Sequence, residues 1–426
     1  MGKAEEFETG HQDRVTVLHT NFNGTRILTA SIDHRIKVWH RDSKTGERTL
    51  IDTFTAHDAD IRDAKFLHPT LGSYIASIGN DLKFHLWTED VSQAPNSGRR
   101  FRRICTIQST PRVPFVSLDL KTTDNVYTTL ALIDRQGLLS IYEPTNPDEL
   151  KEWSLIDTFN VCGSTPPGRG DETSFKVRWD QNPTPLAYIN SLSDDRAQLS
   201  LVVSVLNEVK IYRSVVPGGD FSATDRATHR VMFFEAARLP RHPALVRDVA
   251  WAPFSVQGTD RIATACKDGT IRIFELNVAE ASGGARTDAA AAAKSVQTIS
   301  AQRQQQQQQS SLTSGLTGRG SSTSTPTLSA PAPTPSRAAR TGHVFPFATS
   351  IHSTMSLPSA HTDAWSVSFD GQGQVLMSSG SDGVTKLWRR SVLGGQWLVF
   401  AGQEILDAGE DTDGEDLDED GDDVTD

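Results

Sequence analysis

Short apolar runs, separated by Gly, Asp, Asn and Ser, recur along most of the chain. Residues 361–388 show the pattern most clearly. There a His precedes apolar residues that alternate at Trp365, Val367 and Phe369, and a glycine turn, a second apolar run and Ser-Asp-Gly then lead to Trp388. Alternation with a period of two predicts half-buried strands, and strands this short need neighbours to bury their apolar sides.

The same unit is repeated. In four copies a His is followed four residues later by an apolar residue, and an Asp is followed six residues later by an aromatic residue. Two further units, ending at Tyr142 and Tyr212, keep the alternation but carry Gln136 and Leu206 in the place of the Asp. Six such units predict an all-β chain folded as a six-bladed β-propeller. The repeated His, Asp and aromatic positions are His11, Asp33 and Trp39; His57, Asp81 and Trp87; His242, Asp268 and Phe274; and His361, Asp382 and Trp388.

These polar residues predict a structural role. In a WD-type blade the His, a Ser or Thr of the second strand, the Asp of the turn and the Trp form one buried hydrogen-bonded network, which is favourable only when every member is satisfied. His, Asp and Ser within one unit also resemble acid–base machinery. Because the set recurs from blade to blade, we interpret it as a structural network and not as a catalytic site.

Composition divides the chain into ordered and disordered parts. Residues 1–10 form an N-terminal segment, 11–277 hold blades one to five, and 343–406 hold the end of blade five and blade six. Residues 278–342 include six consecutive glutamines and a Ser/Thr/Pro-rich stretch, and 407–426 are strongly acidic. Segments with so few large apolar residues cannot bury enough surface to fold, so we expect both to be disordered.

Charge and motifs exclude several functions. The net charge of −11 comes from the tail, because residues 404–426 hold thirteen of the 53 acidic residues and leave 40 against 42 basic ones. A neutral body argues against nucleic-acid binding. The three cysteines are far apart, no run of eighteen apolar residues exists, and no catalytic motif is present. We therefore expect no enzyme activity, no cofactor, no metal and no membrane insertion.

The two ends of the ring have nothing left over to join them. The ten residues before His11 are mostly polar and do not form a convincing strand, and blade six has its own outer strand from Trp397 to Ile405. We therefore expect an open ring whose apolar seam accepts a strand or blade from a partner. The predicted seam residues are Val15, Val17, Ile27, Leu28, Val367, Phe369, Val375 and Leu376.

Several stretches resemble the Seh-type (Sec-thirteen homologue) WD-repeat nucleoporins of the Y-shaped scaffold of the nuclear pore. They include ASIDHRIKVW, FLHPTLGSYIASIGNDLKFHLW, HPALVRDVAWAP, AWSVSFDGQGQVLMSSGSDGVTKLW and, most specifically, YEPTNPDELKEWSL from Tyr142 to Leu155. The resemblance implies a six-bladed open propeller at the nuclear envelope. It also implies that a larger helical nucleoporin completes the ring in trans with a blade of its own.

The resemblance leaves other assemblies open. The same family also serves in a coat-like complex at the vacuole or lysosome that regulates nutrient signalling to the TOR kinase. The related Sec-thirteen vesicle-coat subunit shares the endings seen here at Leu387–Ser391 and Gly395–Trp397. Two further alternatives are a peptide-reading propeller adaptor, which would need exposed aromatic or Arg residues on one face, and a propeller hydrolase, which would need inward-pointing carboxylates.

Overall fold

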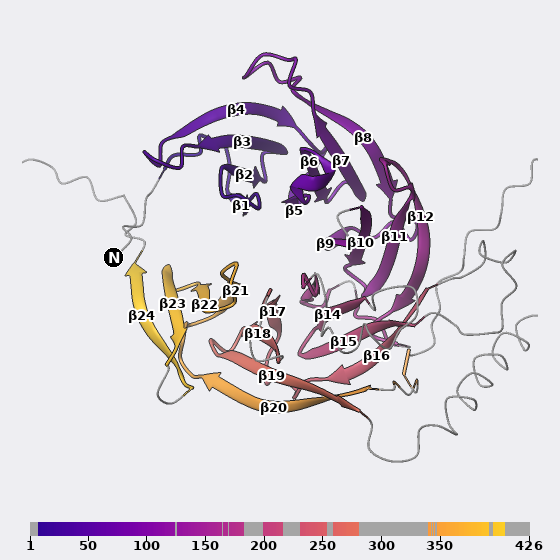
Figure 1. Cartoon of the computed structure of the whole chain (residues 1–426), viewed down its shortest axis with the longest axis vertical. Helices are drawn as coiled ribbons and strands as arrows, with labels where there is room; N and C mark the ends of the chain where they lie inside the picture. Colours follow the sequence, from indigo (N-terminus) through magenta and orange to yellow (C-terminus); the bar gives the residue numbers. More distant parts are fainter. Residues whose placement is uncertain are drawn as a thin grey trace, which may run out of the picture.

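The chain forms a ring of six antiparallel sheets, each of four strands (Figure 1). The computed structural model describes residues 7–123, 126–163, 165–168, 170–182, 199–215, 231–253, 259–280, 340–341, 343, 345, 347–391 and 395–404. Each sheet is one blade, with its strands in sequence order from the centre of the ring to the outside. The prediction of an all-β, six-bladed propeller is confirmed.

The strands are short, and sequence order alone assigns them to blades. Blade one holds β1 (Val15–Thr20), β2 (Arg26–Ser31), β3 (Arg35–Arg41) and β4 (Arg48–Thr55), and blade two holds β5 (Ile61–Phe66), β6 (Tyr74–Gly79), β7 (Lys83–Glu89) and β8 (Phe101–Gln108). Blade three holds β9 (Phe115–Thr123), β10 (Tyr127–Asp134), β11 (Leu138–Asn146) and β12 (Glu149–Asn160), and blade four holds β13 (Phe175–Trp179), β14 (Ser200–Val205), β15 (Glu208–Val215) and β16 (Met232–Arg238). Blade five holds β17 (Val246–Trp251), β18 (Asp260–Cys266), β19 (Ile271–Glu280) and β20 (Phe347–Leu357), and blade six holds β21 (Ala364–Phe369), β22 (Val375–Gly380), β23 (Val384–Arg390) and β24 (Trp397–Glu404).

The turn between the second and third strand of a blade is set by the residue after its Asp. This residue has a positive φ in four blades, of 69° at His34, 68° at Leu82, 80° at Gly269 and 68° at Gly383. At Gly269 a side chain would also collide with the next blade, because an added Cβ would lie 2.0 Å from the carbonyl oxygen of His361. Glycine is therefore required there for space as well as for conformation.

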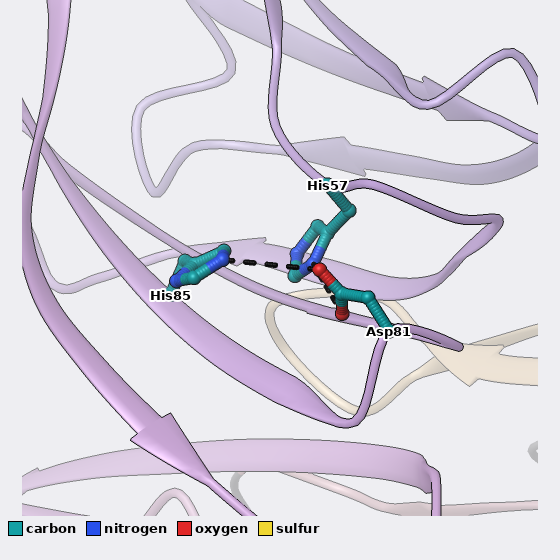
Figure 2. A group of neighbouring side chains, drawn as sticks. All are labelled: His57, Asp81 and His85. Atoms are coloured by element: carbon teal, nitrogen blue, oxygen red, sulfur yellow. Dashed lines mark hydrogen bonds and ion pairs between the residues drawn. The ribbon is translucent and has the colours of Figure 1, made fainter.

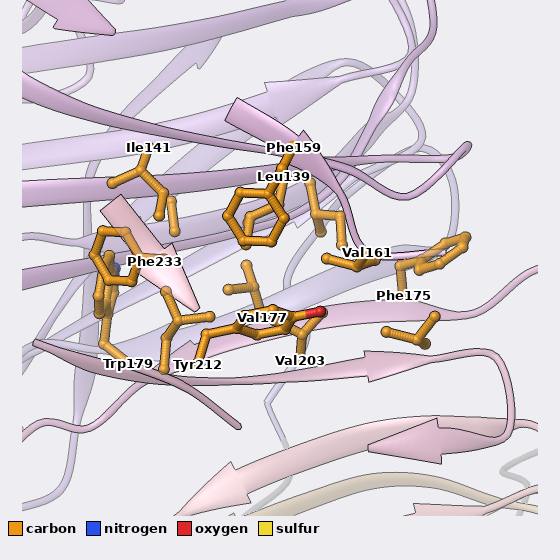
Figure 3. Packing of buried hydrophobic residues seen from close by; sticks show 14 of the residues in the cluster. Leu139, Ile141, Phe159, Val161, Phe175, Val177, Trp179, Val203, Tyr212 and Phe233 are labelled. Carbon is orange, nitrogen blue, oxygen red and sulfur yellow. The ribbon is translucent and has the colours of Figure 1, made fainter. Parts of the chain in front are cut away.

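Each sheet buries apolar side chains against the next sheet in the ring. Five apolar cores join blade one to two, two to three, three to four, four to five and five to six. Figure 3 shows the core between blades three and four, where Phe159, Trp179 and Phe233 pack together. This core replaces the polar network that these two blades lack in their sequence.

Carboxylates join the blades at their backbones. The Asp119 carboxylate of β9 accepts the backbone N–H of Trp179 in blade four at 2.7 Å, and Asp248 accepts that of Val367 in blade six at 3.2 Å. On the outer strands, Asp157 accepts the N–H of Phe233 at 2.8 Å. Such charge-assisted bonds fix the register of neighbouring sheets.

The insertion in blade five differs at both ends from the predicted range 278–342. Strand β19 continues to Glu280, so the blade extends beyond residue 277. At the C-terminal end of the insertion, the Arg340 guanidinium donates to the Asp157 carboxylate of β12 at 2.8 Å, and the backbone carbonyl of Arg340 accepts the N–H of Glu235. The local composition of this segment could not predict the position of Arg340, because the residues that hold it, Asp157 and Glu235, are far away in the sequence. Residues 281–339 and the acidic tail lie outside the described residues.

Substitution Asp119→Ala is expected to lower the free energy of unfolding by about 2–4 kcal/mol. It removes the acceptor of Trp179 and leaves the Lys65 ammonium, 2.7 Å away, without its buried counter-charge. Urea unfolding measures the change. Asp148→Ala, on an exposed turn, is the control and should change stability by less than about 0.5 kcal/mol. A loss at Asp119 as small as that of the control would contradict this role.

Candidate functional site

The His-Asp-Trp sets form closed hydrogen-bonded networks in three blades. In blade two, His57 Nδ1 lies 2.9 Å from Asp81 Oδ1, its Nε2 lies 2.8 Å from Ser77 Oγ, and Trp87 Nε1 donates to the same Ser77 oxygen at 3.0 Å (Figure 2). Because the hydroxyl both donates and accepts, every polar atom in the chain of contacts has a partner. These groups tie the start of β5 to β6, to β7 and to the turn between them.

Blades one and six repeat this geometry. His11 lies 2.8 Å from Asp33 and 3.0 Å from Thr29, to which Trp39 donates at 3.1 Å. In blade six the corresponding distances are 2.9 Å, 2.8 Å and 2.8 Å, among His361, Asp382, Ser378 and Trp388.

The networks hold their carboxylates in the charged form. Burial alone would raise the pKa of Asp81, but the hydrogen bond and charge of His57, with two backbone N–H donors, hold it below its usual value. The pKa of Asp33 is lowered for the same reasons against the same effect of burial. A carboxylate and imidazole committed in this way are structural partners, not a general acid and base.

Blade five departs from the predicted network. His242 Nε2 lies 3.3 Å from Thr264 Oγ1, but its Nδ1 has no hydrogen-bond partner in the described part of the chain. Asp268 instead accepts from the side chain and backbone of Thr270, at 2.6 Å and 2.9 Å. The prediction that Asp268 joins His242 is therefore wrong. Thr270 is a nearer donor, and Phe274 has no N–H with which to complete the set.

The sixth blade-to-blade contact differs from the other five. No apolar core joins β21–β24 to β1–β4 among the residues that the structure describes. These two sheets are the first and last of the ring and face each other across its left side in Figure 1. Their facing sides are the candidate docking site.

The side of blade six that faces away from blade five carries large apolar side chains that are open to solvent, beside the exposed Arg389. Met377 pairs with Leu387, the residue before Trp388, and is 45% exposed. The residues at this position in blades one, two and five are Leu28, Ala76 and Ala263, and each is 0% exposed because the next blade covers it.

The outer strand of blade six adds two large apolar side chains to this side. Leu398 pairs with Arg389, and Phe400 occupies a bulge in β24; they are 55% and 52% exposed. In blade one the bulge position is Ile51, which packs into the core with blade two. We call Met377, Leu398 and Phe400 the blade-six face.

On the opposite wall, formed by blade one, the Trp is already covered, whereas Leu18 of β1 on the same side of the sheet is 60% exposed. Trp39 faces away from blade two, yet it is only 9% exposed because the Phe7 ring packs on it at 5.5 Å, with Arg48 at 4.5 Å from the Phe7 centroid. Lys37 holds the segment by donating to the carbonyl of Thr9 at 2.9 Å. Phe54 covers Trp87 in the same way between blades one and two, at 4.9 Å. Residues 7–10 thus shield Trp39 from solvent, a role that the polar composition of this segment did not indicate.

Known proteins share this fold and sequence. The WD domain, G-beta repeat family matches residues 4–40, 235–275 and 352–389. Nucleoporin SEH1 of Chaetomium thermophilum is 34% identical over 64% of this chain and 65% of its own length, and Nucleoporin SEH1 of Saccharomyces cerevisiae is 32% identical over 64% of this chain and 70% of its own. Nucleoporin SEH1 of Homo sapiens is 21% identical over 92% and 86%. The match to the two fungal proteins spans about two thirds of their length.

The chain belongs to the SEH1 family of nucleoporins. This membership confirms the resemblance seen in the sequence, and it confirms that the chain is not an enzyme, because its SEH1 relatives are WD-repeat structural proteins. Among the described residues of this SEH1-family chain, no helix is long and apolar enough to cross a membrane.

Most of the predicted seam residues of this SEH1-family chain lie elsewhere. Leu28 is part of the core between blades one and two, and Val17 packs against it; Val367 and Leu376 are part of the core between blades five and six, and Phe369 packs against that. For these five residues the prediction is wrong. Ile27 is buried beside Trp39 on the seam side, and Val15 and Val375 are half-buried.

The error has a simple cause. Alternation separates the two faces of a strand, but it does not say which neighbour each face meets. The Trp supplies that information, because Trp87 and Trp388 both pack into the core with the preceding blade. Leu376 pairs with Trp388 and lies on the same side of the sheet. The next residue in the strand, Met377, therefore faces the side of the following blade.

Substitution Phe7→Ala is expected to expose Trp39 and lower the free energy of unfolding by about 1–2 kcal/mol. Amide hydrogen exchange of the peptides that contain residues 10–14 and 35–41 should become faster. Phe22→Ala is the matched control, because Phe22 belongs to the same blade and is 76% exposed. Equal stability and exchange in the two variants would contradict a covering role for Phe7.

Acid is expected to destabilise the fold through His242. Burial, with the charge of Arg272 adding to it, lowers the pKa of His242 to about 4, whereas an unfolded His titrates near 6.5. The unfolded chain therefore binds more protons between these values, and stability falls as the pH is lowered from about 6.5 towards 4. Between pH 7 and pH 5 this group should cost about 1–2 kcal/mol.

Urea unfolding at the two pH values tests this. His242→Gln should reduce the loss of stability between pH 7 and pH 5, whereas His40→Gln, at an exposed position, should keep the full loss. An unchanged pH dependence in His242→Gln would remove His242 as its cause.

Proposed function

We propose that this chain is a structural subunit of the nuclear pore that rigidly docks a larger helical nucleoporin at the seam between blades six and one. Membership in the SEH1 family supports the nuclear pore as its location, at the nuclear envelope. The exposed blade-six face is the observation that carries the docking role, because every other blade has the same side covered by a sheet.

The chemistry of that face favours a β-sheet as the docked element. Met377 projects from β22, and Leu398 and Phe400 project from β24, so the apolar side chains are spread across the sheet and the surface that complements them best is another twisted sheet with an apolar side. A blade donated by the partner supplies such a side, and its backbone can also pair with strand edges at the seam. A peptide-reading adaptor would instead use one face of a closed ring.

The same surface serves a vacuolar or lysosomal coat-like complex that regulates TOR signalling, the second assembly that the resemblance implies. A rigid ring with one apolar docking face needs no change to enter either assembly. Fractionation of cells that carry a tagged chain, followed by identification of the co-purified subunits in the nuclear-envelope and vacuolar fractions, distinguishes the two.

Substitution of Met377 and Phe400 by Asp together is expected to weaken capture of the helical nucleoporin by at least about tenfold, because charged groups would be buried in an apolar contact. The full chain is tagged, used to capture proteins from nuclear-envelope extract at high salt, and the partner is identified by mass spectrometry. Val91→Asp, at an exposed apolar position in blade two, is the control and should retain the partner.

Retention of a stoichiometric, salt-resistant helical nucleoporin by the Met377/Phe400 variant would move the docking site away from the blade-six face. Failure of the unchanged chain to retain any helical nucleoporin would overturn the scaffold role itself.

A further inference from the structure

The network of blade two contains one group that the networks of blades one and six lack. Two residues before the Trp, blades one and six carry Lys37 and Lys386, whose ammonium groups donate to backbone carbonyls of Thr9 and Ala360. Blade two carries His85 at this position. A charged lysine ammonium has no lone pair with which to coordinate a metal ion, whereas a neutral imidazole has one.

His85 is directed towards the carboxylate that His57 also contacts. His85 Nε2 lies 4.0 Å from Asp81 Oδ2, and His57 Nδ1 lies 3.1 Å from the same oxygen (Figure 2). One donor atom from each of the three residues lies within 4.8 Å of the other two. Ligands about 2.0–2.1 Å from a tetrahedral Zn²⁺ are separated by roughly 3.3 Å, so these atoms would have to move closer together. The two imidazole rings are stacked, with centroids 4.7 Å and planes 29° apart, so they would also have to rotate before both nitrogens point at one ion.

The remaining nitrogen of each imidazole is already held. His57 Nε2 lies 2.8 Å from Ser77 Oγ, and His85 Nδ1 lies 3.0 Å from Thr106 Oγ1. Metal-binding histidines usually have their second nitrogen fixed by such an outer partner, which orients the ring and selects its tautomer. Here both rings are oriented so that the other nitrogen is on the side of Asp81.

A metal ion at this position would require a change of tautomer at His57, because its Nδ1 faces the Asp81 carboxylate. On binding, His57 would move its proton from Nδ1 to Nε2, where Ser77 Oγ can accept it.

We propose that His57, Asp81 and His85 form a binding site for one divalent transition-metal ion. Two imidazoles and one carboxylate are the donor set that Zn²⁺ accepts, with a water molecule as the fourth ligand. The site ties the segment after β4 of blade one to β7 of blade two. Bound metal therefore stabilises blade two and its connection to blade one, and blades one and six have no equivalent site because of their lysines.

The test uses the purified full chain, stripped of metal with a chelator and then titrated with Zn²⁺ or Co²⁺. We expect one equivalent to bind by calorimetry, a Co²⁺ absorption spectrum typical of tetrahedral N/O ligands, and a rise of several degrees in Tm. His85→Lys places in blade two the residue that blades one and six already carry, so it should keep the fold. It should weaken binding of the first equivalent at least about thirtyfold and abolish the Co²⁺ spectrum.

Two further variants complete the experiment. His85→Gln removes the ligand without adding charge, and it takes the place of His85→Lys if that variant folds poorly. It should weaken binding of the first equivalent and abolish the Co²⁺ spectrum in the same way. His40→Gln removes an exposed imidazole and should bind the first equivalent as the unchanged chain does. Absence of Zn²⁺ and Co²⁺ binding by the unchanged chain, or unchanged first-equivalent affinity in both His85 variants, would overturn the proposal.

Discussion

The whole structure depends on apolar packing between the faces of neighbouring sheets. A four-stranded sheet of five- to twelve-residue strands cannot bury both of its faces by itself, and in this ring each blade obtains that burial from the blades on either side. Five cores result, and each contains side chains from two blades. A linear series of six sheets necessarily leaves one face at each end, and the properties of these two faces decide what the molecule can do.

Polar groups refine this packing without driving it. Charge-assisted bonds such as Asp119 to Trp179 fix the register between blades, whereas the His-Asp-hydroxyl-Trp networks fix the turn within a blade. Blades three and four show that the networks are dispensable when large side chains fill the space, as Phe159 and Phe233 do. Blade five shows the intermediate case, in which the buried His242 contacts Thr264 through Nε2 while its Nδ1 has no partner in the described region.

Sequence periodicity was sufficient for the fold and insufficient for the docking surface. The six-residue interval from Asp to Trp identified blades because it reports local contacts, and even the degenerate units ending at Tyr142 and Tyr212 kept enough alternation to be counted. The face met by each side chain depends on which neighbour a strand packs against, which is a long-range property. Leu28 and Leu376 were therefore misassigned, and Met377 was missed. Arg340 was missed for the same reason, because its partner Asp157 is 183 residues away.

The two ends of the ring are unequal, and this bears on how a partner would engage them. On blade one, Phe7 already provides to Trp39 the contact that Phe54 provides to Trp87, so a partner gains little by burying that Trp again. On blade six, Met377, Leu398 and Phe400 have no such cover, whereas on the Trp39 side of blade one Leu18 is exposed. Because hydrophobic stabilisation scales with the apolar area removed from water, a docked sheet would derive more binding energy from these three side chains than from Leu18. Residues 7–10 would then form the opposite boundary of the site and limit how far such a sheet extends towards the outside of the ring.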